Sequence, residues 1–179
     1  AALVEEILLA EPVITEIVAV VRREDNHGRL GQTFVVQERE QPPEAATAIV
    51  ANDLTPTVYT DGFIDALAAA ALAAGRSDRT VHVKVDTGMQ RVGAQPEAVT
   101  ALVERIGEHS PMLRLGGVFT HLAVADEPGD EFTALQPDRF DEVLSTLDVT
   151  DDVVIHAANS AGALAHPAAR RSLVRAGIA

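Results

Sequence analysis

The stretch VHVKVDTGMQRVG, residues 81–93, is the centre of the fold prediction for this 179-residue chain. Its β-branched first half predicts a strand, and its second half predicts a polar loop at the end of that strand. Lys84 is the only lysine of the chain, among 13 arginines. A single lysine indicates either a site that needs an amine able to lose its charge or be modified, or chance in an arginine-biased composition.

Strands and helices alternate outward from this stretch. Strands are predicted at residues 55–60, 80–86, 113–122, 152–157 and 172–178. Helices are predicted at 44–53, at 61–75 with Gly75 as the C-terminal cap, after Pro96, and from Pro137 onward, with apolar residues on one face of each that include Leu72, Val99 and Phe140. Right-handed crossovers between such strands predict a parallel sheet, so the fold class is α/β.

A doubly wound sheet and a (β/α)8 barrel both fit this alternation. Polar residues at or just past the ends of the predicted strands favour the barrel, because barrel enzymes build their sites there. At this length the chain supplies about five to six βα units of a partial TIM-type barrel, with the first and last strands missing. Residues 44–179 form the barrel domain. Residues 1–43 are an N-terminal segment whose pattern is the least clear of the chain, with a strand plus a helix predicted at 5–21 and a polar loop at 23–34.

Composition restricts the function classes. With 47% hydrophobic residues the chain buries a core of one domain, and its net charge of −13 argues against nucleic acids and anionic membranes as partners. No apolar run reaches the roughly 18–20 residues of a membrane span, and Glu5 and Glu6 do not fit a signal peptide, so we expect a cytoplasmic protein. The absence of cysteine excludes disulfides and thiol catalysis. The chain begins with Ala and ends within an apolar run, so we expect a fragment.

Two of the four candidate clusters follow predicted strands 80–86 and 113–122. Lys84, Asp86 and Arg91 place an amine, a carboxylate and a guanidinium at one strand end, which indicates an anion site, a Schiff-base lysine or a buried ion pair. His121 is a candidate acid, base or cofactor contact, or a hydrogen-bonded structural histidine.

The other two clusters follow the last predicted strands. Asn159 and Ser160 open a segment of small residues that suits either a phosphate or an ordinary helix N-cap. Arg175 and Gly177 offer a cation and a backbone that a ligand can approach closely, or a turn. A phosphate site beside a lysine and two arginines is typical of barrels that bind phosphorylated cofactors.

Five ordered motifs resemble the bacterial alanine racemase family, which is a pyridoxal 5′-phosphate (PLP)-dependent, fold-type III barrel enzyme. They are VKVDTGMQRVG, GVFTHLAVADEP, FTALQPDRFDEVL, HAANSAGALAHP and LVRAGIA. They lie within residues 44–179, whereas residues 1–43 match the family poorly. The resemblance implies an isomerase that interconverts L- and D-alanine, supplies D-alanine for peptidoglycan and works as a homodimer.

The resemblance also implies roles for individual residues. Lys84 matches a carbamylated lysine that supports Arg91, which binds the substrate. Arg175 matches the residue that faces the pyridine nitrogen of PLP. The cofactor-binding residues implied in this way are His121, Asn159, Ser160, Arg175, Gly177 and Ile178, and no metal ligand is implied.

The chain departs from the family pattern at both catalytic bases. The lysine that forms the Schiff base with PLP precedes residue 84 in the family, and no other lysine is present here. The second base is a tyrosine from the partner's C-terminal domain, and Tyr59, the only tyrosine, lies in the wrong segment. We therefore expect the chain to be inactive alone. A non-catalytic PLP-binding or subunit-interaction module, and a racemase for another amino acid such as serine, are the alternatives.

Overall fold

The computed structural model describes residues 17–24, 30–36, 43–127 and 129–177. Within these residues the elements are, in chain order, β1 (Ile17–Glu24), β2 (Leu30–Val36), α2 (Pro43–Ala51), β3 (Thr55–Val58), α3 (Asp61–Ala73), β4 (Arg79–Lys84), η1 (Pro96–Ala98), α4 (Val99–Glu108), β5 (Leu113–Phe119), α5 (Phe132–Ser145), β6 (Val154–His156), α6 (Ser160–Ala165) and η2 (Pro167–Ala169).

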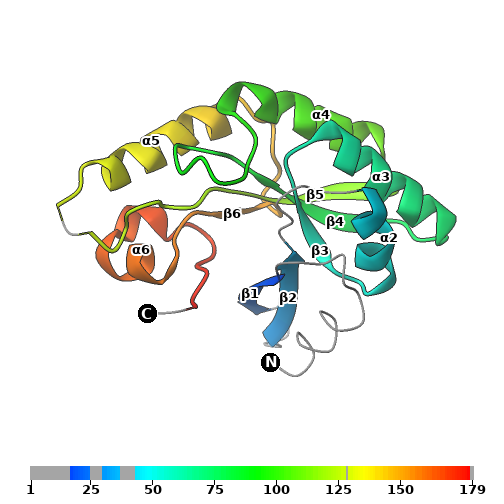
Figure 1. Cartoon of the computed structure of the whole chain (residues 1–179), viewed down its shortest axis with the longest axis horizontal. Coiled ribbons are helices and arrows are strands. Elements are labelled where there is room, and N and C mark those ends of the chain that lie inside the picture. The colour runs from blue at the N-terminus through cyan, green and yellow to red at the C-terminus, as the bar shows by residue number, and fades with distance from the viewer. Residues whose placement is uncertain (1–16, 25–29, 37–42, 128, 178–179) are drawn as a thin grey trace.

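The described strands form one sheet in which spatial order follows chain order, β1-β2-β3-β4-β5-β6. From β2 onward each strand pairs in parallel with the next. Helices α3, α4 and α5, which connect β3 to β6, form an arc along one side of the sheet (Figure 1). A doubly wound sheet carries helices on both faces, so this arrangement is that of a barrel wall and confirms the α/β class.

The apolar layer between sheet and helices follows the predicted periodicity. In α3, Phe63, Ile64 and Leu67 are buried, but Leu72, predicted on the same face, is 67% exposed. Each residue advances about 100° around a helix, so Leu72 is turned away from the buried Ala71 toward solvent. The predicted cap is confirmed. Gly75 has φ +62° and donates its N–H to the Leu72 carbonyl.

The two proline-marked helices differ in their starts. Pro96 opens η1, which runs directly into α4 and its buried Val99, as predicted. The prediction that Pro137 begins a helix is wrong, because α5 starts at Phe132 and contains Pro137. The Asp130 carboxylate accepts the Phe132 N–H at 2.8 Å and so provides an earlier helix start.

The N-terminal segment contains a β-hairpin. Strands β1 and β2 pair antiparallel, and β2 joins the parallel sheet through Val35–Thr55 and Val36–Pro56. The polar loop predicted for 23–34 is therefore wrong at 23–24 and 30–34, because backbone pairing with neighbouring strands places these residues in the sheet. A strand plus a helix was predicted for 5–21, but residues 17–21 belong to strand β1, so the helix prediction is wrong there. Residues 5–16 lie outside the described residues.

The last predicted strand, 172–178, is reduced to one isolated bridge between His156 and Leu173. The Ser172 hydroxyl accepts the Ile155 N–H and donates to the Ile155 carbonyl, at 3.0 and 2.8 Å. The Ser172 side chain thus makes hydrogen bonds to the Ile155 backbone that backbone groups would make in a longer β-ladder. The segment still lies beside β6, because the Arg175 N–H donates to the Ala158 carbonyl at 3.0 Å.

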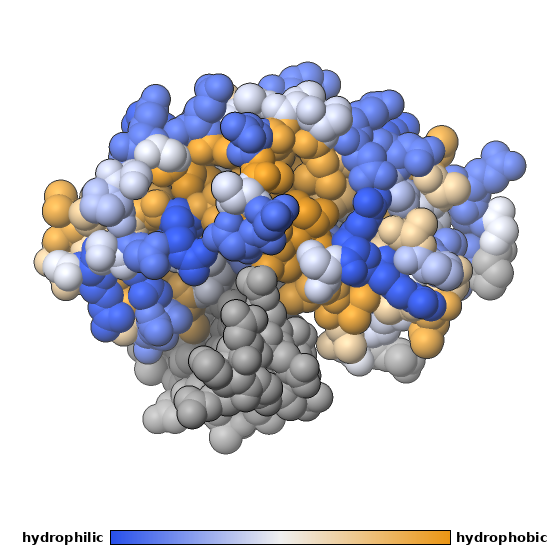
Figure 2. All heavy atoms as spheres, turned by 180° about the vertical axis from the view of Figure 1, so that it is seen from behind, coloured by the Kyte–Doolittle hydropathy of each residue, from blue (hydrophilic) through white to orange (hydrophobic). Residues whose placement is uncertain are grey.

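The face of the molecule opposite to the view of Figure 1 carries both hydrophobic and hydrophilic surface. Apolar atoms gather at its centre, with hydrophilic groups above and beside them (Figure 2). Among the residues that the structure describes, no helix has the length and hydrophobicity required to cross a membrane.

Candidate active site

The ends of three parallel strands align three side chains in one row. Lys84 pairs with Phe119 in register, and Phe119 pairs with His156. Phe119 stacks on the His156 ring at a centroid distance of 4.5 Å, and the Lys84 Nζ lies 5.8 Å from the Phe119 ring. Residues two apart in a strand share a face, so His82 points to the same side as Lys84. All four side chains are buried.

Arg175 is a buried cation held by neutral groups. Its guanidinium donates to the carbonyls of Thr120 and Ala157, at 2.8 and 2.9 Å, and to the His156 ring at 2.7 Å. It also lies 5.1 Å above the Phe119 ring. Burial lowers the pKa of Arg175 to about 10, which leaves it charged at neutral pH.

The contacts of Arg175 determine the tautomers of two histidines. A guanidinium only donates, so His156 Nδ1 accepts and its proton is on Nε2. That Nε2–H then donates to His82 Nδ1 at 3.1 Å, so His82 carries its proton on Nε2. Burial first, and then the charges of Arg114 and Arg175, lower the pKa of His82 to about 4, and the His156 pKa is also well below its ordinary value because of burial.

Gly117 on β5 makes room for this histidine pair. A Cβ at Gly117 would lie 2.8 Å from the His82 ring, closer than real Cβ contacts. Phe119, His82 and His156 were not among the predicted site residues. The alternation of 81–86 and the glycine pair of 113–122 are the signals in the sequence that place His82 opposite a gap.

The predicted cations gather around His121. Burial first, and then the charges of Arg175, Lys84 and Arg91 in that order, lower the pKa of His121 to about 3. The ring is therefore neutral at physiological pH. The structure thus brings together four predicted site residues from three strand ends, with Arg91 exposed in the loop after β4.

The start of α6 brings together three further predicted residues. Asn159 caps the helix, because its Oδ1 accepts the Gly162 N–H at 2.9 Å. Ser160 Oγ accepts the Gly177 N–H at 3.0 Å, although 17 residues separate them. The cap predicted as the alternative for Asn159 is thus present, and it leaves a hydroxyl beside a loop amide. Ile178 lies outside the described residues.

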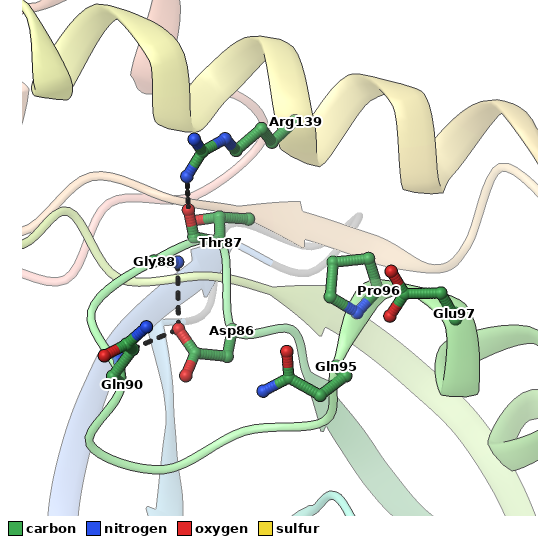
Figure 3. A pocket seen from close by; sticks show the side chains of 8 residues that line it. All are labelled: Asp86, Thr87, Gly88, Gln90, Gln95, Pro96, Glu97 and Arg139. Carbon is green, nitrogen blue, oxygen red and sulfur yellow. Dashed lines mark hydrogen bonds between the residues drawn. The ribbon is translucent and has the colours of Figure 1, made fainter.

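The loop after β4 borders a pocket of about 250 Å³ on the side of α5 (Figure 3). Asp86 Oδ1 accepts the N–H groups of Gly88 and Gln90, at 2.9 and 3.0 Å, and Arg139 donates to the Thr87 carbonyl at 3.0 Å. The Asp86 carboxylate therefore folds the loop that carries Arg91. Among the described residues, no group of three or more His, Cys, Asp or Glu is arranged to hold a metal ion.

Comparison with known proteins decides the family. The family model "Alanine racemase, N-terminal domain" matches residues 10–179. The chain belongs to this family. Its fold is accordingly part of the TIM-like barrel of the alanine racemase N-terminal domain, as predicted. The match includes most of the N-terminal segment 1–43, and the domain division at residue 43 stays a prediction.

Individual relatives agree with this assignment. An alanine racemase of Symbiobacterium thermophilum is 42% identical over 142 residues, which are 76% of this chain and 36% of the relative. The alanine racemase of Clostridium difficile 630, solved in complex with cycloserine, matches with a TM-score of 0.67 at 35% identity, over 76% of this chain and 38% of that one. The chain thus spans about a third of the length of these relatives.

A solved histidine racemase from Leuconostoc mesenteroides subsp. sake matches with a TM-score of 0.71 over 82% of this chain and 39% of that chain. Its sequence is only 24% identical, so this match shows a shared fold alone.

Proposed function

We propose that the chain is the PLP-binding part of an alanine racemase that interconverts L- and D-alanine. The observation that carries the proposal is the buried Arg175. A guanidinium has five N–H donors, and the contacts to Thr120, Ala157 and His156 use three of them. We propose that the other two, which these contacts do not use, serve a ligand atom at the strand ends. An uncharged pyridine nitrogen accepts such a bond, and an always-charged arginine keeps that nitrogen unprotonated.

The other residues also fit PLP. The hydroxyl of Ser160, the amide of Gly177 and, by family resemblance, the amide of Ile178 suit a phosphate group, with Asn159 fixing the helix start. The cations around His121 favour an anionic ligand. When bound, PLP supplies an electron sink for loss of the substrate α-proton, and an arginine partner makes that sink shallower, which limits side reactions.

Lys84 and Arg91 are proposed to form the substrate side of the site. Lys84 is 1% exposed, and carbamylation would replace its positive charge with a negative one. Carbamylation joins the Lys84 nitrogen to the carbon of carbon dioxide with loss of one amine proton. The resulting negative charge holds Arg91, which binds the alanine carboxylate.

We propose that neither catalytic base is among these 179 residues. Lys84 is the only lysine and is assigned to carbamylation, and the only tyrosine, Tyr59, lies after β3. The chain therefore binds PLP and does not racemise alanine by itself. In the complete enzyme we propose a cytoplasmic homodimer that supplies D-alanine for peptidoglycan.

Titration of the purified chain with PLP, followed by absorbance and equilibrium dialysis, tests this proposal. Ser160→Ala removes the hydroxyl beside Gly177 and should weaken binding about tenfold, the size of one hydrogen bond to a charged group. Ser145→Ala, an exposed serine on α5, is the matched control and should bind like the wild type. Equal affinities of Ser160→Ala and the wild type would contradict the phosphate assignment.

The role of Lys84 is tested by borohydride reduction of the PLP-treated chain and mass spectrometry. We expect no PLP attached to Lys84. Attachment that disappears in Lys84→Ala would show that Lys84 is the cofactor lysine instead. The chain could also bind PLP non-covalently and yet restore no racemase activity when it is combined with the missing parts of the enzyme. This result would favour the alternative, a non-catalytic PLP-binding or subunit-interaction module. Restored activity on serine in place of alanine would favour the other alternative.

A further inference from the structure

Gln136 on α5 connects the two loops that carry the predicted site residues. Its side chain is fully buried. Its Nε2 donates to Thr87 Oγ1 and to the His121 carbonyl, both at 3.0 Å, and its Oε1 accepts the Ala123 N–H at 2.8 Å. One amide thus bonds to the loop after β4 and, twice, to the loop after β5.

Proton counting gives this network a single direction. Thr120 Oγ1 donates its only proton to the Val85 carbonyl at 3.0 Å. Thr120 must therefore accept in its 2.7 Å contact with Thr87, whose hydroxyl donates. Thr87 in turn accepts from Gln136. The chain of donors runs from Gln136 through Thr87 and Thr120 to Val85, and none of these hydroxyl protons is left to rotate.

The network joins groups immediately beside the candidate site. Val85 follows Lys84, and the Thr87 carbonyl is additionally held by Arg139 at 3.0 Å. Thr120 also accepts Arg175 at its backbone carbonyl, at 2.8 Å. A shift of one loop relative to the other would change the separation between Arg91 and His121.

We infer that Gln136 is a positioning residue that sets the spacing between the Lys84–Arg91 loop and the His121 loop, and so the shape of the PLP and substrate site. This inference rests on the proposed function. Only a side-chain amide of this length has two donors and one acceptor in the required geometry. A carboxylate would lose the two donors, and an apolar side chain would leave the Ala123 N–H and the His121 carbonyl unbonded in the interior.

Gln136→Met tests the inference, because it retains the volume of the side chain and removes its three hydrogen bonds. Leu135→Met, at the exposed residue next to Gln136 on α5, is the matched control. Hydrogen exchange in the unliganded chain should accelerate about tenfold or more at the Ala123 amide, whose acceptor is lost, and stay unchanged in α4. The affinity for PLP should fall about tenfold relative to Leu135→Met.

Thr87→Val and Thr87→Ser give a second, milder test. Valine keeps the shape of threonine without its hydroxyl, so Thr87→Val should weaken PLP binding, as Gln136→Met does. Thr87→Ser keeps the hydroxyl and should bind PLP like the wild type. If Gln136→Met does not fold, the two Thr87 variants decide the question.

Three results would overturn the inference. The first is faster hydrogen exchange throughout α4 as well as at Ala123. The second is a PLP affinity of Gln136→Met equal to that of Leu135→Met. The third is equal PLP binding by Thr87→Val and Thr87→Ser. Absence of PLP binding by the wild-type chain would instead refute the proposed function. In that case local acceleration at Ala123 in Gln136→Met would still support the connection between the loops, and its absence would refute it.

Discussion

The two faces of strand β4 are buried to the same degree by opposite kinds of side chain. Val81 and Val83 are fully buried in the hydrophobic core, whereas His82 and Lys84 on the other face are 5% and 1% exposed. Apolar burial stabilises the fold by about 25 cal/mol per Å². Buried polar groups instead cost free energy unless they are hydrogen-bonded. Burial of the valines therefore stabilises the fold, whereas burial of His82 and Lys84 places polar groups in the candidate site.

The largest effect should come from the apolar layer. Phe140 on α5 is fully buried, and Phe140→Ala should lower the free energy of unfolding by about 3–5 kcal/mol, because it removes apolar contacts and leaves a cavity. Leu135→Ala on the same helix is the control, since Leu135 is 48% exposed and its loss should cost less than about 0.5 kcal/mol. Urea unfolding measures both. Similar losses for the two variants would mean that α5 does not close the core.

An intermediate effect should come from the polar layer, and it should depend on pH. His82 has a folded pKa of about 4 against 6.5 when unfolded, so the unfolded state binds more protons between these values. Its contribution to stability is complete above pH 6.5 and is lost as pH falls toward 4. At pH 5 the loss is about 2 kcal/mol.

The variant His82→Gln should remove the His82 part of this pH dependence and keep the parts that arise from His121 and His156, whose pKa values are also lowered. Between pH 7 and pH 5, the wild type should lose about 2 kcal/mol more stability than His82→Gln, in urea unfolding at each pH. His166→Gln, at a partly exposed histidine after α6, is the control. Identical pH profiles for His82→Gln and the wild type would show that His82 is not held neutral by the fold.

The smallest effect should come from the helix surface, outside both layers. Arg105 on α4 contacts Asp65 and Glu108 at 2.8 and 2.6 Å, but the side chains are well exposed. Solvent screens such pairs, so Arg105→Gln should change the melting temperature far less than Phe140→Ala. A comparable change in calorimetry would mean that surface ion pairs contribute as much to stability as the core.

Regular parts of the fold were predictable because their signal is local. The spacing of Phe63, Ile64 and Leu67 identified α3, and the glycine after it identified its end. The start of α5 was not predictable in this way, since it depends on Asp130 rather than on Pro137. The strand expected at 172–178 was lost to a serine hydroxyl that bonds to β6.

The candidate site shows the same division. Lys84, Arg91, His121 and Arg175 were selected from their places at strand ends and from family resemblance. In the structure the charges of the other three act on His121 and lower its pKa. Gln136 lies inside a motif quoted for the family, yet helical periodicity describes it only as one more position of a helix. Its role depends on partners 13 to 49 residues away.

The sequence by itself determined the α/β class, the family and most of the polar residues at the strand ends, because hydrophobic periodicity and ordered motifs are properties of neighbouring residues. Only the tertiary structure decided which side chains contact His82 and Lys84 on the polar face of β4. It also decided which tautomers His82 and His156 adopt and how Gln136 links two loops. These features depend on hydrogen bonds between residues far apart in the chain. Which group donates in each bond follows from the groups that lie close together in space and from the number of donor protons on each.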